Sequence, residues 1–138
     1  MTAFITVTTG VLVFVLGQIV LKLIIEPWQA QRILIAKVAH HLMFYANVYS
    51  NPGTCKDETN SEASAEARKL SSESAGLRSQ IPFYSRLSRT FFFPNEKHLL
   101  VVEKMLIGLS NSTRSGDPED NEKRIDKIRE LLEIKSYE

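Results

Sequence analysis

The first 21 residues of the chain carry no charged side chain, and this feature limits what the chain can fold into more than any other. Phe4 to Ile25, interrupted only by Lys22, is apolar enough and long enough to cross a bilayer core, which takes about 20 residues for ~30 Å. In lipid the backbone must satisfy its own hydrogen bonds, so we expect a helix despite the many β-branched residues. Residues 1–26 are therefore predicted to be a transmembrane anchor, and residues 27–138 a helical domain in water.

A cleavable signal peptide is the alternative explanation of this segment. Such a peptide has a positively charged start, an apolar run of about 7–15 residues and a small-residue cleavage site. Here the start is uncharged, the apolar run is longer, and Glu26-Pro27-Trp28 follows it. An uncleaved anchor is the favoured interpretation.

Basic residues near the ends of the anchor predict its direction. The N-terminal side has no Lys or Arg, whereas Lys22, Arg32 and Lys37 lie on the C-terminal side. Basic residues favour the cytoplasmic side, so we expect a short N-terminus outside the inner membrane and the domain in the cytoplasm. Lys22 can extend its amine toward the headgroups, and Trp28 suits the membrane interface, so lipid is an expected partner.

One stripe of the anchor is formed mostly by small residues at alternating spacings of three and four: Ala3, Thr6, Gly10, Val13, Gly17, Val20 and Ile24. Small residues let helices approach closely in lipid, where packing drives association. Gln18, one residue off the stripe, can donate a hydrogen bond to a neighbouring helix. The stripe predicts a homo-oligomer or packing against another membrane protein. The alternative is that Gly and Thr are simply common in membrane helices.

The remaining chain is predicted to form about four helices in a small bundle with short connections. Pro27 either begins a new helix or kinks a continuous one. From Trp28 to Tyr49, apolar spacing places a core face on one side and Gln31 with Arg32 and Lys37 mostly opposite. The core face consists of Leu34, Val38, His41, Leu42, Tyr45 and Tyr49. The turn residues Asn51-Pro52-Gly53 end this helix.

Capping signals place the other helices. Thr59 and Glu62 form a capping-box pattern before a helix that runs to Pro82 and buries mainly small residues. Asn95 and Asp117 are expected to cap two further helices. The run Phe91-Phe92-Phe93 cannot point into one helical face as a whole, so at least one of these rings is expected on the surface or against lipid headgroups.

Composition excludes several classes of function. The 17 basic and 16 acidic residues nearly cancel, whereas a dedicated nucleic-acid binder usually has a basic excess, so no nucleic-acid partner is expected. The single Cys55 can form no internal disulfide. His40 and His41 point about 100° apart on a helix, which disfavours a metal site. Motifs of hydrolases, metalloproteases and nucleotide-binding proteins are absent, so we expect neither an enzyme nor a cofactor.

One set of polar residues is a candidate ligand or partner site. Several helix ends carry tyrosines and asparagines that meet if the bundle runs up and down: Tyr45, Asn47, Tyr49, Tyr84 and Asn111. Together with an arginine such as Arg68, they can bind a small anionic ligand. The alternative is that these residues cap helix ends and satisfy buried backbone groups.

Four stretches resemble a group of small bacterial membrane proteins of unknown function. They are VFVLGQIVLKLIIEP, HLMFYANVYSNPG, the segment Leu77–Tyr84 and MLIGLSNS. The resemblance implies a bacterial inner membrane and a cytosolic domain, and it implies no activity and no site.

The sequence thus predicts an oligomeric, single-pass inner-membrane protein whose cytosolic bundle is an interaction or scaffold module. Two alternatives stay open at this point. One is a membrane effector that senses a small anionic molecule and perturbs the membrane, and the other is an accessory subunit of a membrane complex.

Overall fold

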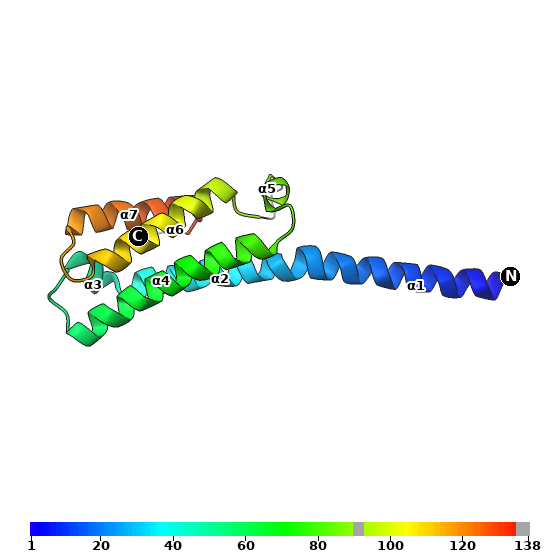
Figure 1. The fold of residues 1–138 in the computed structure, drawn as a ribbon, viewed down its shortest axis with the longest axis horizontal. Coiled ribbons are helices and arrows are strands. Elements are labelled where there is room, and N and C mark those ends of the chain that lie inside the picture. The colour runs from blue at the N-terminus through cyan, green and yellow to red at the C-terminus, as the bar shows by residue number, and fades with distance from the viewer. Residues whose placement is uncertain (90–92, 135–138) are drawn as a thin grey trace.

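The structure, a computed structural model, describes residues 1–89 and 93–134. It is all-helical, with 82% of the described residues in helices and no strand among them. A long apolar helix is followed by several shorter ones, as predicted (Figure 1). The elements are α1 (Thr2–Val20), a π-helical turn (Leu21–Ile25), α2 (Glu26–Phe44), α3 (Ala46–Ser50), α4 (Asp57–Gln80), α5 (Tyr84–Leu87), α6 (Glu96–Ser112) and α7 (Pro118–Leu131).

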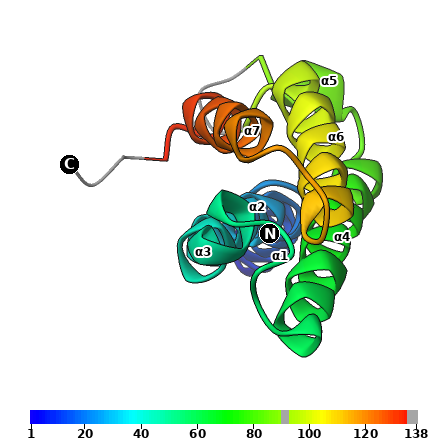
Figure 2. The same ribbon diagram turned by 90° about the vertical axis from the view of Figure 1, so that its left-hand side faces the viewer.

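The helices after α1 form a small up-and-down bundle. α4 packs between α2 and α6, and α7 packs on α6 and on α3 (Figures 1 and 2). The short α5 lies at the end of the bundle from which α1 leaves, and α3 lies at the opposite end (Figure 1). Among the fully buried side chains of the core, the largest apolar ones are Leu42, Tyr49, Leu99, Leu106, Leu109 and Ile128.

α1, the π-helical turn and α2 form one continuous helix, Thr2–Phe44, of 43 residues. Among the described residues, this is the one helix long and apolar enough to cross a membrane. No residue of α1 is buried against the rest of the chain, whereas α2 contributes Leu34 and Val38 to the bundle core. The same helix is therefore an exposed apolar rod at one end and a core element at the other.

Pro27 accounts for the π-helical turn. Proline has no N–H to donate, and its ring clashes with the carbonyl one turn back, so a regular α-helix cannot pass through it undisturbed. Just upstream, the N–H of Glu26 donates to the carbonyl of Leu21, five residues back. Such a turn holds one extra residue, which rotates α2 relative to α1 by about 100°. Of the two alternatives for Pro27, the continuous but distorted helix is the one observed.

The prediction that Gln31 lies opposite the core is wrong. Its side chain is 0% exposed, and neither amide atom has a hydrogen-bond partner among the described residues. Gln31 lies three residues before Leu34 and seven before Val38, so helical spacing places it on their face. The polarity of Gln31 suggested the solvent-exposed face, but its position in the helix places it on the core face.

Two predicted helix boundaries are also wrong. The helix predicted from Trp28 to Tyr49 is interrupted at Tyr45, whose φ of −98° and ψ of 18° separate α2 from α3. α4 begins at Asp57 with no side-chain cap at Lys56, so the capping box predicted at Thr59 does not form. Acidic Asp57 and Glu58 instead occupy the first turn, where they interact favourably with the helix dipole.

The other predicted caps are confirmed. Asn95 Oδ1 accepts a hydrogen bond from the N–H of Lys97, and Asp117 Oδ1 accepts one from the N–H of Glu119. Phe93 is buried in the segment before α6. Phe91 and Phe92 lie outside the described residues.

Two glycines provide a matched test of this backbone. Gly53 has φ +77°, and a Cβ there would lie 2.5 Å from the carbonyl oxygen of Arg114, whereas a Cβ at Gly76 in α4 meets nothing within 4 Å. We expect Gly53→Ala to lower the free energy of unfolding by about 1–3 kcal/mol through strain. We expect Gly76→Ala to raise it by about 1 kcal/mol, because alanine favours a helix interior. Urea unfolding of the full chain in mild detergent, followed by circular dichroism, measures both. Equal effects of the two substitutions would contradict this description of the loop.

Candidate functional site

The predicted packing residues of the anchor are exposed along α1. A Cβ added at Gly10 or Gly17 meets no other atom within 4 Å, so no part of the chain covers this stripe. Thr6 Oγ1 donates to the carbonyl of Thr2 at 3.0 Å, which satisfies the hydroxyl within the helix. Gln18 is exposed in the last turn of α1. A packing partner for these residues must come from outside this chain, and their role stays a prediction.

The predicted interface residues lie just after the stripe. Lys22 forms an exposed ion pair with Glu26, with 3.3 Å between Nζ and Oε1. An exposed pair of this kind contributes little to stability, so Lys22 can exchange it for a lipid phosphate. Trp28 is 36% exposed in the first turn of α2. Their contact with a membrane stays a prediction.

The predicted ligand residues are divided between the two ends of the bundle. Tyr45, Asn47 and Tyr49 lie at the α3 end, and Asn111 lies near the end of α6 on the same side (Figure 1). Tyr84 belongs to α5 at the opposite end, where its hydroxyl donates to the carbonyl of Pro94 at 3.0 Å. The expected meeting of all these side chains at one end therefore does not occur.

A buried hydrogen-bonded pair, which the sequence did not reveal, occupies the α3 end. His41 Nε2 lies 2.7 Å from the Tyr49 hydroxyl, and both side chains are fully buried. On the other side of the ring, His41 Nδ1 lies 3.6 Å from a carboxylate oxygen of Glu66 on α4. Tyr45 packs its ring on His41 at 5.0 Å between centroids. The cluster therefore connects α2, α3 and α4.

Burial fixes the protonation of this cluster. Desolvation lowers the pKa of His41, and the nearby Glu66 carboxylate only partly opposes the shift. Burial likewise raises the pKa of Tyr49. The imidazole is thus neutral at neutral pH. With its proton on Nδ1, the neutral ring directs an N–H toward Glu66 and accepts a hydrogen bond from the Tyr49 hydroxyl at Nε2.

Asn121 attaches α7 to this region. Its side-chain amide donates to the backbone carbonyl of Tyr49 at 3.0 Å, and its Oδ1 accepts from Arg124 at 3.0 Å. Asn121 is fully buried. A polar residue early in a highly charged helix gave no sequence signal for this role, because only the packing of α7 on α3 buries it.

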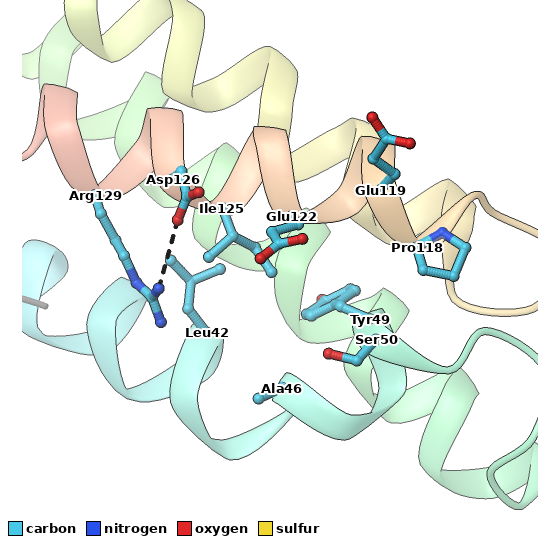
Figure 3. A pocket seen from close by; sticks show the side chains of 10 residues that line it. All are labelled: Leu42, Ala46, Tyr49, Ser50, Pro118, Glu119, Glu122, Ile125, Asp126 and Arg129. Atoms are coloured by element: carbon cyan, nitrogen blue, oxygen red, sulfur yellow. Dashed lines mark ion pairs between the residues drawn. The ribbon is translucent and has the colours of Figure 1, made fainter. Parts of the chain in front are cut away.

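A groove runs between α7 and the α2–α3 segment, with a volume of about 410 Å³ (Figure 3). Tyr49 and Leu42 form part of one wall. The opposite wall carries the carboxylates of Glu119, Glu122 and Asp126, beside Arg129, whose Nη1 lies 3.7 Å from Asp126. An acidic wall repels an anion, so this groove does not suit the anionic ligand that the sequence predicts near Tyr49.

A second cavity, of about 280 Å³, suits an anion better. It is lined by Asn60, Ser61, Ser64, Arg68, Ser110, Asn111, Thr113 and Arg114. Arg68 Nε donates to Ser110 Oγ at 2.7 Å, and its Nη2 donates to Asn111 Oδ1 at 2.8 Å. The structure therefore brings the two predicted residues Arg68 and Asn111 into contact. The lining has two guanidinium groups, several hydroxyls and no carboxylate.

No group of three or more His, Cys, Asp or Glu side chains within residues 1–89 and 93–134 has the arrangement of a metal site. No family model matches the chain, and comparison with curated proteins and with solved structures finds no significant similarity. The resemblance noted from the sequence stays a prediction.

His41 and His40 form a matched pair for testing the buried cluster. Because the folded state holds the pKa of His41 below its ordinary value, the unfolded chain binds more protons as the pH falls below about 6.5. The stabilisation is thus complete above that pH and decreases below it. We expect the free energy of unfolding to fall between about pH 7.5 and about pH 5. His41→Gln should reduce this dependence, whereas His40→Gln, on the exposed face, should retain it. An unchanged pH profile in His41→Gln would contradict the burial of a neutral imidazole.

Proposed function

We propose that the chain is a single-pass inner-membrane protein whose cytosolic helical bundle acts as an oligomeric interaction or scaffold module. The observation that carries this proposal is the continuous helix Thr2–Phe44. Its first half offers only exposed apolar surface, and its second half belongs to the bundle core. A module built in this way holds the bundle directly at the membrane and allows no free linker between them.

Exposure of α1 supports a lipid environment. Bulky apolar side chains project from all sides of the helix, with Phe4, Phe14 and Leu16 each more than half exposed. Contiguous apolar surfaces of this extent in water are rare and mark contact with membranes or proteins. The basic residues that follow the anchor, such as Arg32 and Lys37, support a cytoplasmic bundle.

Self-association has support on both halves of the long helix. In α1 the stripe with Gly10 and Gly17 is open to a neighbour. In α2 the face opposite the core carries exposed Ile33, Met43 and Phe44. The π-helical turn rotates α2 by about 100°, which brings this outer face to roughly the same side as the α1 stripe. Copies anchored in one membrane have parallel long helices, so both surfaces can meet a second copy together.

Gly17 and Val15 provide the test of this association. They are close in α1 but about 160° apart around the helix. Gly17→Leu places a bulky side chain on the stripe without touching the rest of the chain, so we expect it to shift purified full-length protein toward monomer. Val15→Leu should leave the mass unchanged. Mass measurement in mild detergent, by light scattering with detergent correction, gives the result.

A monomeric wild-type chain would contradict self-association, and equal behaviour of the two variants would move the interface away from the stripe. If residues 27–138 alone assemble, the outer face of α2 or the charged surfaces of the bundle become the interface.

A ligand-sensing effector is the second candidate, supported by the cavity with Arg68 and Arg114. Asn60 Oδ1 in its lining is buried without a hydrogen-bond partner among the described residues. Two guanidinium groups and an open acceptor suit an anion that also carries a hydroxyl or amine, such as a phosphate ester. The cavity is bounded by α4 and α6, so a ligand there would contact α6 and α4, and α4 packs directly on α2.

Thermal shift of the full chain in detergent tests this second function. A ligand that binds the folded state at 100 times its dissociation constant stabilises it by about 2.7 kcal/mol and raises Tm. We expect inorganic phosphate or a nucleotide to raise Tm in the wild type and less so in Arg68→Gln. Lys69→Gln, which removes a neighbouring charge outside the cavity, should behave like the wild type. No shift with any of these anions would count against the sensing function.

A further inference from the structure

The segment around α5 lies at the membrane end of the bundle. Figure 1 places α5 at the end of the bundle from which α1 leaves. Its position along the long axis is close to that of the junction between α1 and α2. The last turn of α4, which leads into α5, also lies at this position along the long axis, because Leu77 and Gln80 share a groove with Ala30 of α2. Ala30 follows Trp28 by two residues. If α1 spans the bilayer as proposed, α5 therefore lies near the headgroups, to one side of the anchor (Figure 2).

Phe83 projects from this segment into solvent. Its side chain is 73% exposed, and its backbone has φ 57°, a left-handed conformation that a bulky residue rarely adopts. The turn is held in place, because the N–H groups of Arg86 and Leu87 both donate to the Phe83 carbonyl. The next residue, Tyr84, is buried and bonded to the Pro94 carbonyl. The fold thus fixes an aromatic side chain in an outward position.

The charge around Phe83 is positive. From Ser74 to Asn95 the sequence has no acidic residue, and its three arginines are Arg78, Arg86 and Arg89. Arg78 is paired with Glu96 and Glu103 on α6. Arg86 and Arg89 are exposed, and neither forms an ion pair with a residue that the structure describes. The guanidinium carbon of Arg86 lies 5.7 Å from the centre of the Phe83 ring.

We propose that α5 and Phe83 form a second membrane contact, in which Phe83 enters the boundary between headgroups and acyl chains and Arg86 and Arg89 bind phosphates of anionic lipids. Aromatic residues with adjacent basic residues are typical of this depth in membranes. Basic residues near an anionic surface add electrostatic attraction to it. This inference rests on the proposed membrane anchoring. It adds a contact that fixes the tilt of the bundle on the membrane, because the bundle then touches the surface at two separate points.

Spin labels on the full chain in lipid nanodiscs test the proposal. In a Cys55→Ser background, a nitroxide is placed at Ser85→Cys in α5, and a matched one at Ser50→Cys in α3 at the far end. A third label at Val11→Cys reports whether the anchor is inserted. In discs that contain phosphatidylglycerol, we expect the label at residue 85 to have several-fold lower accessibility to a water-soluble nickel reagent than the label at residue 50.

Removal of the contact should reverse this protection. Discs of phosphatidylcholine alone, Phe83→Ser and the pair Arg86→Gln with Arg89→Gln should each raise nickel accessibility at residue 85. The pair Lys69→Gln with Lys123→Gln, which removes the same charge away from α5, should not. If the label at residue 85 is exposed to water while the label at residue 11 is embedded in lipid, this inference is overturned and membrane anchoring is retained. A water-exposed label at residue 11 would overturn membrane anchoring and this inference together.

Discussion

The continuity of the helix from Thr2 to Phe44 is the constraint on which the rest of the structure depends. A proline near the junction would ordinarily separate an anchor from its domain. Here the π-helical turn at Leu21–Ile25 absorbs Pro27, and the helix continues into the core. Because α2 carries Leu34, Val38 and Leu42, any rotation or tilt of α1 acts directly on the packing of the bundle. This coupling is what distinguishes the chain from a domain attached by a flexible linker.

Small and polar side chains determine how the other helices pack on the long helix Thr2–Phe44. Small residues Ala63 and Ala67 are fully buried and allow α4 to approach its neighbours closely. Between α4 and α6, Ser74 donates to Glu103, whose other carboxylate oxygen lies 3.3 Å from Arg78. Buried polar groups that satisfy one another define a single arrangement, because a shift of one helix would leave them unpaired. Gln31 departs from this pattern, since neither polar atom of its buried amide has a hydrogen-bond partner among the described residues.

Acidic and basic side chains are concentrated on different surfaces of the bundle. The anion-compatible cavity with Arg68 and Arg114 lies between α4 and α6, whereas α7 presents Glu119, Glu122 and Asp126 to the groove beside α2 and α3. The segment around α5, with Arg86 and Arg89, is basic and lies at the end where α1 leaves. The acidic groove, the cavity with its two arginines and the basic segment around α5 therefore lie on separate surfaces of the bundle.

The sequence by itself determined the all-helical class, the apolar N-terminal segment, the caps at Asn95 and Asp117 and most of the core face of α2. These features depend on composition and on spacing along one helix, which are local properties. Local patterns failed where a neighbouring element decides. Asn121 is buried because another helix covers it, and Tyr84 and Asn111 lie apart because α5 and the end of α6 occupy opposite ends of the bundle. The contact of His41 with Tyr49 and Glu66, and that of Arg68 with Asn111, likewise required the tertiary structure. Contacts between distant parts of the chain depend on how helices turn and pack, and spacing within one helix carries no information about that.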